Sequence, residues 1–505
     1  MTCTAWTWTR GSSHFYSFLG NQRARNTAIL TSLSLLLLGA LLAWALPLLI
    51  VPRVIEKLVL KEFKDLIFPL HTLNACRLQN FIASVDPRAR PFLTRKLAAR
   101  ILARLREQHA VRIQAAVKGI RTDEDAVLYL TESGLLAEMN LSPAEARQRL
   151  RAIDCGARLF RPRGDHTEFN PLGPPCPPLR LPAEWEPVGA VIVSFPLYDP
   201  RGWKVHADFI QALNTEAKIF ILVGNEFWQK AVEVYLTSQG VGLENLSFFQ
   251  IPAEDVWTRD YGPTVVFSGA ESQPVMIWNP YFIADQAYYK FDADATAGLA
   301  MALDLPLCRL PLVIEGGNLI TDGRGTIILS ESVLEANPEV DREGLEAIMR
   351  DYFGCTRLIT LPALPAEITG HIDMAVKFAK EDTLFVACAH PGSKWHGELE
   401  QMASRLSQIR AGTGQPFRVI RVPLPRRTAS PYCFWSYVNS LTLNRKVIVP
   451  MFRVPEDAAA LELYRSVMPG YEVEGVDFHR YPVGSAHCQA KGIPAAALPV
   501  EERET

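Results

Sequence analysis

A histidine and a cysteine lie side by side near the C-terminus, as His487 and Cys488 in the segment PVGSAHCQAKG. A cysteine thiolate is a strong nucleophile, and a histidine elsewhere in the chain can exchange protons with its substrate. Cysteine is also among the most frequently buried apolar residues, so Cys488 alone does not indicate catalysis. Because Gly484 and Ser485 precede it, we predict that Cys488 lies in a loop and not in a core strand.

The segment TGHIDMAVKF offers a histidine and a carboxylate two residues apart, His371 and Asp373. In a β-strand this spacing places both side chains on one face, because successive side chains alternate between faces. An isolated pair of this kind also fits an ordinary surface ion pair.

Two further segments place acidic residues next to glycine. VWTRDYGP carries Arg259 and Asp260 just before a Gly-Pro turn. In VIEGGNLITDG, Glu315 is expected to end an apolar strand, and Gly316 and the next glycine allow another group to approach the backbone closely. Each segment, taken alone, also has an ordinary explanation as a loop.

Taken together, these segments occur in an order that is typical of one enzyme family. The full set is PAEWEP (182–187), WTRDYGP (257–263), EGGN (315–318), GHID (370–373), SYVN (436–439) and HC (487–488). On these motifs the chain resembles the agmatine deiminase and bacterial, Porphyromonas-type peptidylarginine deiminase family of guanidine-modifying enzymes. The resemblance covers residues 181–494 and not the N-terminal region. Single motifs are weak signals, whereas six in order with compatible spacing are a strong one.

The resemblance implies roles for the matching residues. Cys488 resembles the nucleophile, His371 the general acid and base, Asp260 and Asp373 the carboxylates that bind the guanidinium, and Glu315 the acid that orients the histidine. Further predicted substrate contacts are Asn439, Arg259, Trp257 and Gly316. No metal and no organic cofactor are expected.

These residue types suit the chemistry of a guanidinium. The group is planar and permanently charged, so two carboxylates can bind its N–H donors in bidentate fashion. Its carbon is a poor electrophile and needs both a thiolate and a proton for the departing nitrogen. The expected reaction converts agmatine, free arginine or an arginine-containing peptide to a ureido product and ammonia, through a covalent cysteine amidino-thioether intermediate. The alternatives are an amidinotransferase, or a catalytically silent protein of this fold that serves as a membrane-attached binding module.

The substrate beyond the guanidinium is left open. Agmatine deiminases typically carry an acidic stretch before GHID, whereas the matching segment here, LPAEITGHID, has Glu367 as its only acid. WTRDYGP and NLITDG look closer to the peptidylarginine branch.

The pattern of strands and helices predicts an α/β class. Short β-rich runs alternate with candidate helices at 204–213, 227–238, 342–352, 397–410 and 456–468. The runs are AVIVSF, KIFILV, PTVVF, PVMIW, TIILS, DTLFVA, FRVIRV and KVIVPMF. The resemblance implies, more specifically, the pentein α/β propeller of five ββαβ modules around a pseudo-fivefold axis, with the active site at its centre.

The N-terminal third predicts a different organisation. We expect a basic tail (1–25), a single-pass transmembrane anchor (26–52), a helical basic region (53–160) with a helix start at Ser142, a Pro-rich linker or strap (161–180) and the catalytic domain (181–496). A cleaved signal peptide is a poorer match, because its apolar core is shorter, about 7–15 residues. The basic amphipathic stretch at 88–121 fits either a helix on anionic lipid, which would place the enzyme on the cytoplasmic face of a membrane, or a face of a small helical bundle.

The net charge of −2 over 505 residues conceals an uneven distribution. Residues 1–52 carry +3 and residues 87–121 carry +9, which leaves −14 for the rest. An acidic catalytic part attracts a cationic substrate. No nucleic-acid partner is expected, since no recognised module accompanies the basic stretch. The nine cysteines contain no CxxC pair, which argues against a zinc site or a disulfide framework.

Overall fold

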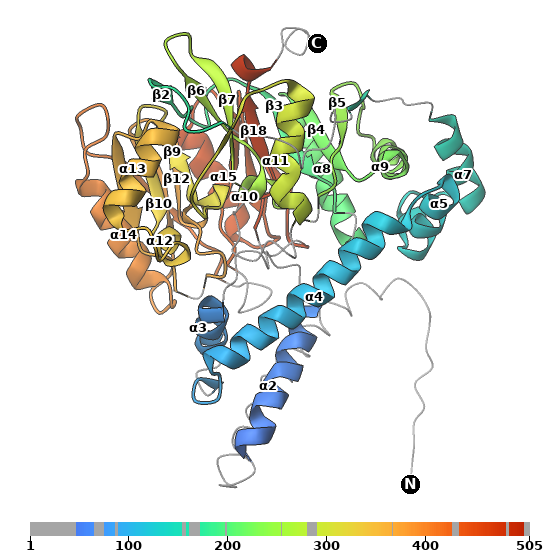
Figure 1. Cartoon of the computed structure of the whole chain (residues 1–505), viewed down its shortest axis with the longest axis horizontal. Helices are drawn as coiled ribbons and strands as arrows, with labels where there is room; N and C mark the ends of the chain where they lie inside the picture. Colours follow the sequence, from blue (N-terminus) through green and yellow to red (C-terminus); the bar gives the residue numbers. More distant parts are fainter. Residues whose placement is uncertain are drawn as a thin grey trace.

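The structure of the protein is a computed structural model, shown in Figure 1. It describes residues 47–64, 75–85, 89–153, 158–160, 172–196, 199–253, 255–279, 290–365, 367–426, 434–480 and 484–498. Helices of the N-terminal part lie along one side of an α/β body (Figure 1).

The described N-terminal helices range from 4 to 25 residues in length. They are α2 (Pro47–Lys64), α3 (Ala75–Val85), α4 (Arg95–Gly119), α5 (Asp123–Glu132), α6 (Leu135–Glu138) and α7 (Pro143–Ala152). The predicted start at Ser142 is confirmed. Its hydroxyl accepts from the Glu145 backbone N–H at 3.2 Å while the Glu145 carboxylate accepts from the Ser142 N–H at 2.8 Å, which is a capping box.

The prediction of a membrane anchor, and of a single-pass membrane localisation, is corrected by the structure. Residues 26–46 of the expected span lie outside the described residues. Residues 47–52, its last six, instead begin α2, whose Glu56 is buried and pairs with Arg100 and Arg104 of α4 at 2.8 Å. Among the helices that are described, none combines the length and the apolar character needed to cross a bilayer.

The apolar stripe of the basic stretch packs inside the protein. Its five predicted positions are all buried: Leu93, Leu97, Ile101, Leu102 and Leu105. They share a hydrophobic core with Leu78 and Phe81 of α3. Of the two interpretations of residues 88–121, the helical bundle is therefore the one that these contacts support.

Helices α5 to α7 dock on the α/β body. The ring of Tyr129 in α5 meets that of Trp228 edge to face at 4.8 Å. Asn225, the N-cap of α9 (Glu226–Ser238), donates its side-chain amide to the Ile120 carbonyl at 2.9 Å. These contacts join the N-terminal helices to the body through both apolar packing and hydrogen bonds.

Within the described residues the strands form five sheets. In order across the sheet, the five-stranded one contains β1 (Arg158–Phe160), β5 (Leu246–Gln250), β4 (Lys218–Val223), β3 (Val188–Ser194) and β18 (Lys491–Pro494). The four-stranded sheet contains β2 (Leu179–Arg180), β6 (Thr264–Ser268), β7 (Gln273–Trp278) and β8 (Leu307–Arg309). The three-stranded sheets contain β11 (Arg357–Leu361), β10 (Thr326–Ser330) and β9 (Ile320–Thr321); β12 (Val376–Lys380), β13 (Thr383–Cys388) and β14 (Arg418–Pro423); and β15 (Leu441–Leu443), β16 (Lys446–Met451) and β17 (Glu472–Asp477).

Each sheet contains the same unit, in which an antiparallel pair is followed by a helix and a strand that joins in parallel. The pairs are β18·β3, β6·β7, β9·β10, β12·β13 and β15·β16, and the parallel partners are β4, β8, β11, β14 and β17. The connecting helices are α8 (Trp203–Leu213), α11 (Lys290–Leu303), α12 (Ser332–Ala336) with α13 (Arg342–Phe353), α14 (His396–Gln408) and α15 (Glu456–Val467). The predicted α/β class is confirmed, and every predicted run and helix has a counterpart. Strands such as β4 are buried over almost their whole length, which explains their continuous apolar sequence.

Two local predictions are wrong. His371 and Asp373 do not lie in a strand: His371 precedes the single 3-10 turn η7 (Ile372–Met374), which leads into β12. Glu315 does not end a strand either, but precedes a similar turn, η6 (Gly316–Asn318). Glycine adjoins each site: Gly370 adopts φ +65°, which interrupts an extended conformation before His371, and Gly316 and Gly317 form the turn that follows Glu315.

The Pro-rich segment is partly described. Residues 161–171 lie outside the described part of the chain. Beyond them, the Leu172 backbone N–H donates to the Leu307 carbonyl at 2.8 Å, and β2 pairs antiparallel with β6. The segment from Leu172 onward thus runs as an extended strap along the β6 to β8 sheet.

Candidate active site

Cys488 lies in a buried turn before β18, as its glycine-containing surroundings predicted, and only 2% of its surface is exposed. Asn439 holds this turn. Its amide N–H donates to the Cys488 sulfur at 3.1 Å, and its carbonyl oxygen accepts from the backbone N–H groups of Ser485 at 3.0 Å and of Cys488 at 3.3 Å. One side chain therefore contacts the thiol and holds the backbone of its turn at two N–H groups.

His371 lies between two carboxylates. Its Nε2 is 3.1 Å from a carboxylate oxygen of Glu315, and its Nδ1 is 3.6 Å from one of Asp260. Burial on its own would lower the pKa of the imidazole, but Asp260 and Glu315, with a contribution from Asp373, outweigh it and raise the pKa to about 10. At neutral pH His371 is thus a buried imidazolium, ready to donate a proton.

Asp373 lies next to the cysteine. Its Oδ2 is 3.8 Å from the Cys488 sulfur and accepts from His487 Nδ1 at 2.7 Å. Its other oxygen, Oδ1, is buried without a hydrogen-bond partner among the described residues. Such an oxygen is costly to bury unless a ligand completes its hydrogen bonds.

The electrostatic environment of the thiol is negative. Burial, followed by the charges of Asp373 and Asp260, raises the pKa of Cys488 well above its usual value, although the hydrogen bond from Asn439 partly opposes the shift. The same two carboxylates act on His371. Cys488, His371 and the carboxylates therefore act on one another electrostatically, and the carboxylate charges add to the effect of burial in raising the thiol pKa.

Comparison with known proteins places the segment that contains this cluster in a family. The sequence profile of the Porphyromonas-type peptidyl-arginine deiminase family matches residues 180–494, which is more than half of the chain. The chain belongs to this family. Membership identifies it as an enzyme of a family that acts on guanidino groups, as the six motifs predicted.

Individual relatives agree. A Yersinia pseudotuberculosis protein, named as a candidate agmatine deiminase, is 26% identical over an alignment of 356 residues that covers 63% of this chain and 95% of the relative. Two solved structures superimpose with a TM-score of 0.57. One is a candidate arginine deiminase from Porphyromonas gingivalis, with 23% identity over 64% of this chain and 100% of the other. The second is an agmatine deiminase of Enterococcus faecalis, with 20% identity over 63% of this chain and 96% of the other. They establish that residues of the matched segment share the α/β fold of these deiminases.

The other predicted site residues of this family member are Arg259, Trp257 and Gly316, and they pack near the turn that carries Cys488. Arg259 donates its backbone N–H to the Cys488 carbonyl and its Nε to the His487 carbonyl, both at 3.1 Å. Trp257 is buried under the same turn, where a β-carbon on Gly484 would come within 2.4 Å of its ring. Gly316 approaches so closely that a β-carbon would lie 2.0 Å from the Arg259 carbonyl. The predicted substrate contacts of these three residues stay predictions; the described contacts of Arg259 and Trp257 are to the cysteine turn, and Gly316 packs against Arg259.

Sequence reasoning missed a second layer of charged residues, which is connected to Asp373 through His487. His487 Nε2 is 3.5 Å from Glu184, which accepts from the buried Lys377 at 2.5 Å. Burial opposes ionisation of Glu184, but Lys377 and His487 outweigh it and lower its pKa. The signals were present, since His487 adjoins the cysteine and Glu184 lies in PAEWEP, but only the fold brings them together.

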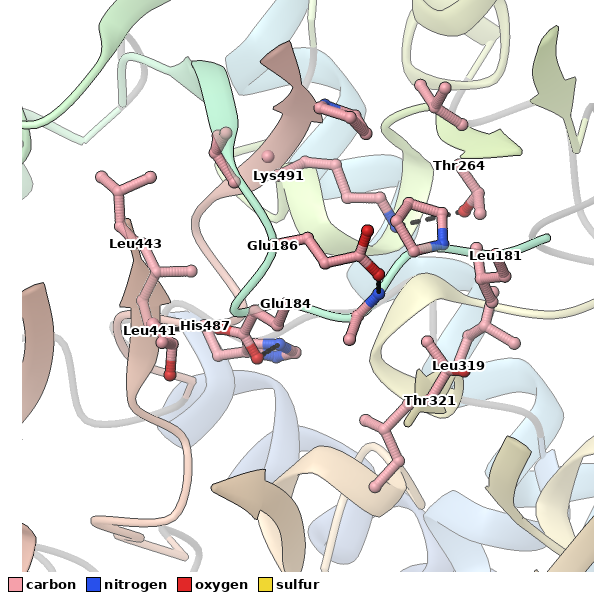
Figure 2. Close-up of a pocket in the computed structure, with 18 of the residues that line it drawn as sticks. Leu181, Glu184, Glu186, Thr264, Leu319, Thr321, Leu441, Leu443, His487 and Lys491 are labelled. Atoms are coloured by element: carbon pink, nitrogen blue, oxygen red, sulfur yellow. Dashed lines mark hydrogen bonds and ion pairs between the residues drawn. The ribbon is translucent and has the colours of Figure 1, made fainter. Parts of the chain in front are cut away.

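A pocket of ≈110 Å³ opens onto this second layer (Figure 2). Glu184, His487 and Lys491 line it, together with Arg259. Burial and the charge of Arg259 lower the pKa of Lys491 to about 7, although nearby carboxylates oppose the shift. Cys488 and His371 are not among the lining residues, so the pocket meets the cluster from the side of His487.

At Gly317, even the addition of a single methyl group is expected to disturb the site. A β-carbon there would lie 2.4 Å from His371 Nδ1 and 3.1 Å from an Asp260 oxygen. We expect Gly317→Ala to lower kcat/KM by about 10²-fold, because displacement of a catalytic group by about 1 Å has effects of that size. Gly397→Ala is the control, since nothing lies within 4 Å of a β-carbon there. Wild-type kinetics in Gly317→Ala would contradict the observed packing.

Proposed function

We propose that this protein is a hydrolase that deiminates a guanidinium group, on agmatine, free arginine or an arginine-containing peptide, to a ureido group and ammonia. The observation that carries the proposal is the buried cluster of Cys488, His371, Asp260, Asp373 and Glu315 within the segment that matches the family. Cys488 would act as nucleophile, His371 as general acid and base, the two aspartates as guanidinium ligands and Glu315 as the group that orients His371.

The geometry suits a planar cation. Asp260 and Asp373 are both buried, and one oxygen of Asp373 lacks a partner within the described part of the chain. A guanidinium presents a fork of N–H donors that two carboxylates can accept. Its positive charge would also offset the carboxylates that hold the pKa of Cys488 high, so that the thiolate forms as the substrate binds.

Two half-reactions follow from these positions. The Cys488 thiolate adds to the guanidinium carbon, and the C–N bond breaks as protonated His371 gives its proton to the departing nitrogen, which leaves as ammonia. Neutral His371 then takes a proton from water, and the water oxygen adds to the amidino carbon. The C–S bond then breaks and the hydroxyl proton of the adduct passes to solvent, which releases the neutral ureido product and returns the thiolate. The raised pKa of His371 supports its role as the acid in the first step.

We also infer that residues 181–496 form the catalytic unit and that the five ββαβ sheets surround one axis, as in a pentein propeller. The repeated antiparallel and parallel pairing in each sheet supports this arrangement.

A substrate panel tests the function. Agmatine, free arginine and arginine-containing peptides are compared by kcat/KM, with colorimetric detection of the ureido group. Glu367 bears on the choice, because its two oxygens accept from Thr369 and from the Gly370 N–H and are thereby engaged in the loop before His371. We expect ureido product and stoichiometric ammonia from at least one class of substrate. An active-site-intact preparation that is inert on every guanidine would overturn the proposal.

An acceptor amine separates deimination from amidino transfer. With glycine added in excess, a hydrolase still forms the ureido product at the same rate. An amidinotransferase would release the amine of the donor and form a new guanidino compound, which mass spectrometry detects.

A further inference from the structure

An arginine outside the family-matching segment contacts the loop that carries His371. Arg77 lies in α3, which Figure 1 shows next to α12 beneath the catalytic body. Its Nη1 donates to the Thr369 carbonyl at 2.8 Å, and its Nη2 donates to the Ser332 carbonyl at 3.3 Å. One guanidinium thus bridges two segments of the catalytic domain.

Both segments hold His371 in place. The Thr369 hydroxyl accepts from the His371 backbone N–H at 3.1 Å. The Ser332 hydroxyl donates to the Gly370 carbonyl at 2.9 Å and accepts from the Asn318 amide at 3.2 Å. Arg77 therefore links Thr369 and Ser332, and each of these two residues is hydrogen-bonded to the backbone at or just before His371.

The contact is close as well as polar. Gly370 adopts φ +65°, and a β-carbon there would lie 3.2 Å from the guanidinium carbon of Arg77. A side chain at position 370 would therefore be strained by the backbone and would press against Arg77. The glycine permits both the turn before His371 and the approach of α3.

Helix α3 is itself fixed. Leu78 and Phe81 are buried in the core shared with α4, and the Gln79 amide donates to the Leu93 carbonyl at 2.5 Å. Arg77 consequently extends from a packed helix, so its position depends on the N-terminal helices. The family profile begins only at residue 180, so this support is an addition to the matched domain.

We propose that Arg77 is a positioning residue for His371, through which the N-terminal helices become part of the active-site scaffold. The proposal rests on the proposed function, because the imidazole must donate its proton from a fixed place. Catalytic groups need to be held to within about 0.5 Å, and the bridge restrains the loop at two carbonyl groups. Any movement of α3 would then change the rate of the proton-transfer step.

Kinetics of the full-length protein test the proposal. We expect Arg77→Ala to lower kcat by about 10- to 100-fold and to change KM by less than about 3-fold, because Asp260 lies outside the loop and the Asp373 carboxylate is also held by His487 at 2.7 Å. Arg77→Lys should recover part of the loss, since an ammonium can reach one carbonyl but cannot bridge two. Asn80→Ala is the matched control: Asn80 lies on the same helix, is exposed, and makes its side-chain hydrogen bond to Cys76.

Amide hydrogen exchange gives a second readout that needs no substrate. We expect faster exchange in the peptide covering residues 367–374 of Arg77→Ala, with wild-type exchange in β4 and β16. Unchanged exchange in that peptide would overturn the proposal, and so would an increase in kcat, which would mean that α3 obstructs the site. If the wild-type protein is inert on every guanidine, the proposed function fails, whereas the exchange data still decide whether Arg77 holds the loop.

Discussion

Cys488→Ala is expected to lower kcat/KM on any guanidinium substrate by about 10⁴-fold or more. Removal of a covalent nucleophile has effects of this order, because no remaining group can form the intermediate. Water in the site would have to attack a resonance-stabilised carbon directly. Initial rates of ureido formation, measured with enough enzyme to detect one turnover per day, give the ratio.

Two comparisons make the result specific. Cys388→Ala, at the end of β13 and partly exposed, should keep wild-type activity. Rapid acid quench of the wild-type enzyme with substrate should trap an adduct on the peptide that contains Cys488, detected by mass spectrometry. Full activity in Cys488→Ala, or an adduct on a different cysteine, would refute the assignment.

The parts of the fold that the sequence predicted are those in which a single local pattern decides the outcome. Runs such as KIFILV became β4 because a strand covered on both faces is apolar throughout. Helix α11 was not predicted, since Ala293, Ala295, Ala297 and Ala300 are all buried and leave no amphipathic stripe to recognise. The membrane anchor is the opposite error: apolar residues were taken as a span, although the described end of that run continues into a charged, packed helix.

The candidate site divides in the same way. Motifs identified Cys488, His371 and the carboxylates, but the positions of these residues depend on glycine turns that override the strand period. Arg259 shows what motifs leave out: its predicted substrate contact stays a prediction, whereas its contacts with the cysteine turn become visible only in the fold. The contact of Arg77 with Thr369 joins residues 292 positions apart, and no local pattern could have predicted it.

The negative charge of Asp373 is expected to have opposite effects on substrate binding and on ionisation of the thiol. Asp373 would help to bind the substrate cation, yet its charge, after burial, is the largest electrostatic cause of the raised pKa of Cys488. A group that favours binding thus disfavours the reactive form of the nucleophile in the empty site. Substitution of this one side chain should separate the two effects.

Asp373→Asn is expected to lower kcat/KM by about 10²- to 10³-fold, while iodoacetamide alkylates Cys488 faster than in the wild type. Loss of one partner of a buried charge pair typically costs about 2–5 kcal/mol, which accounts for the kinetic loss. Removal of the negative charge lowers the thiol pKa, so at any pH below that pKa a larger fraction is thiolate and the pH profile of alkylation shifts to lower pH. Asp382→Asn, beyond the opposite end of β12, should change neither quantity. Slower alkylation in Asp373→Asn would mean that Asp373 activates the thiol as a base, and the electrostatic account would have to be abandoned.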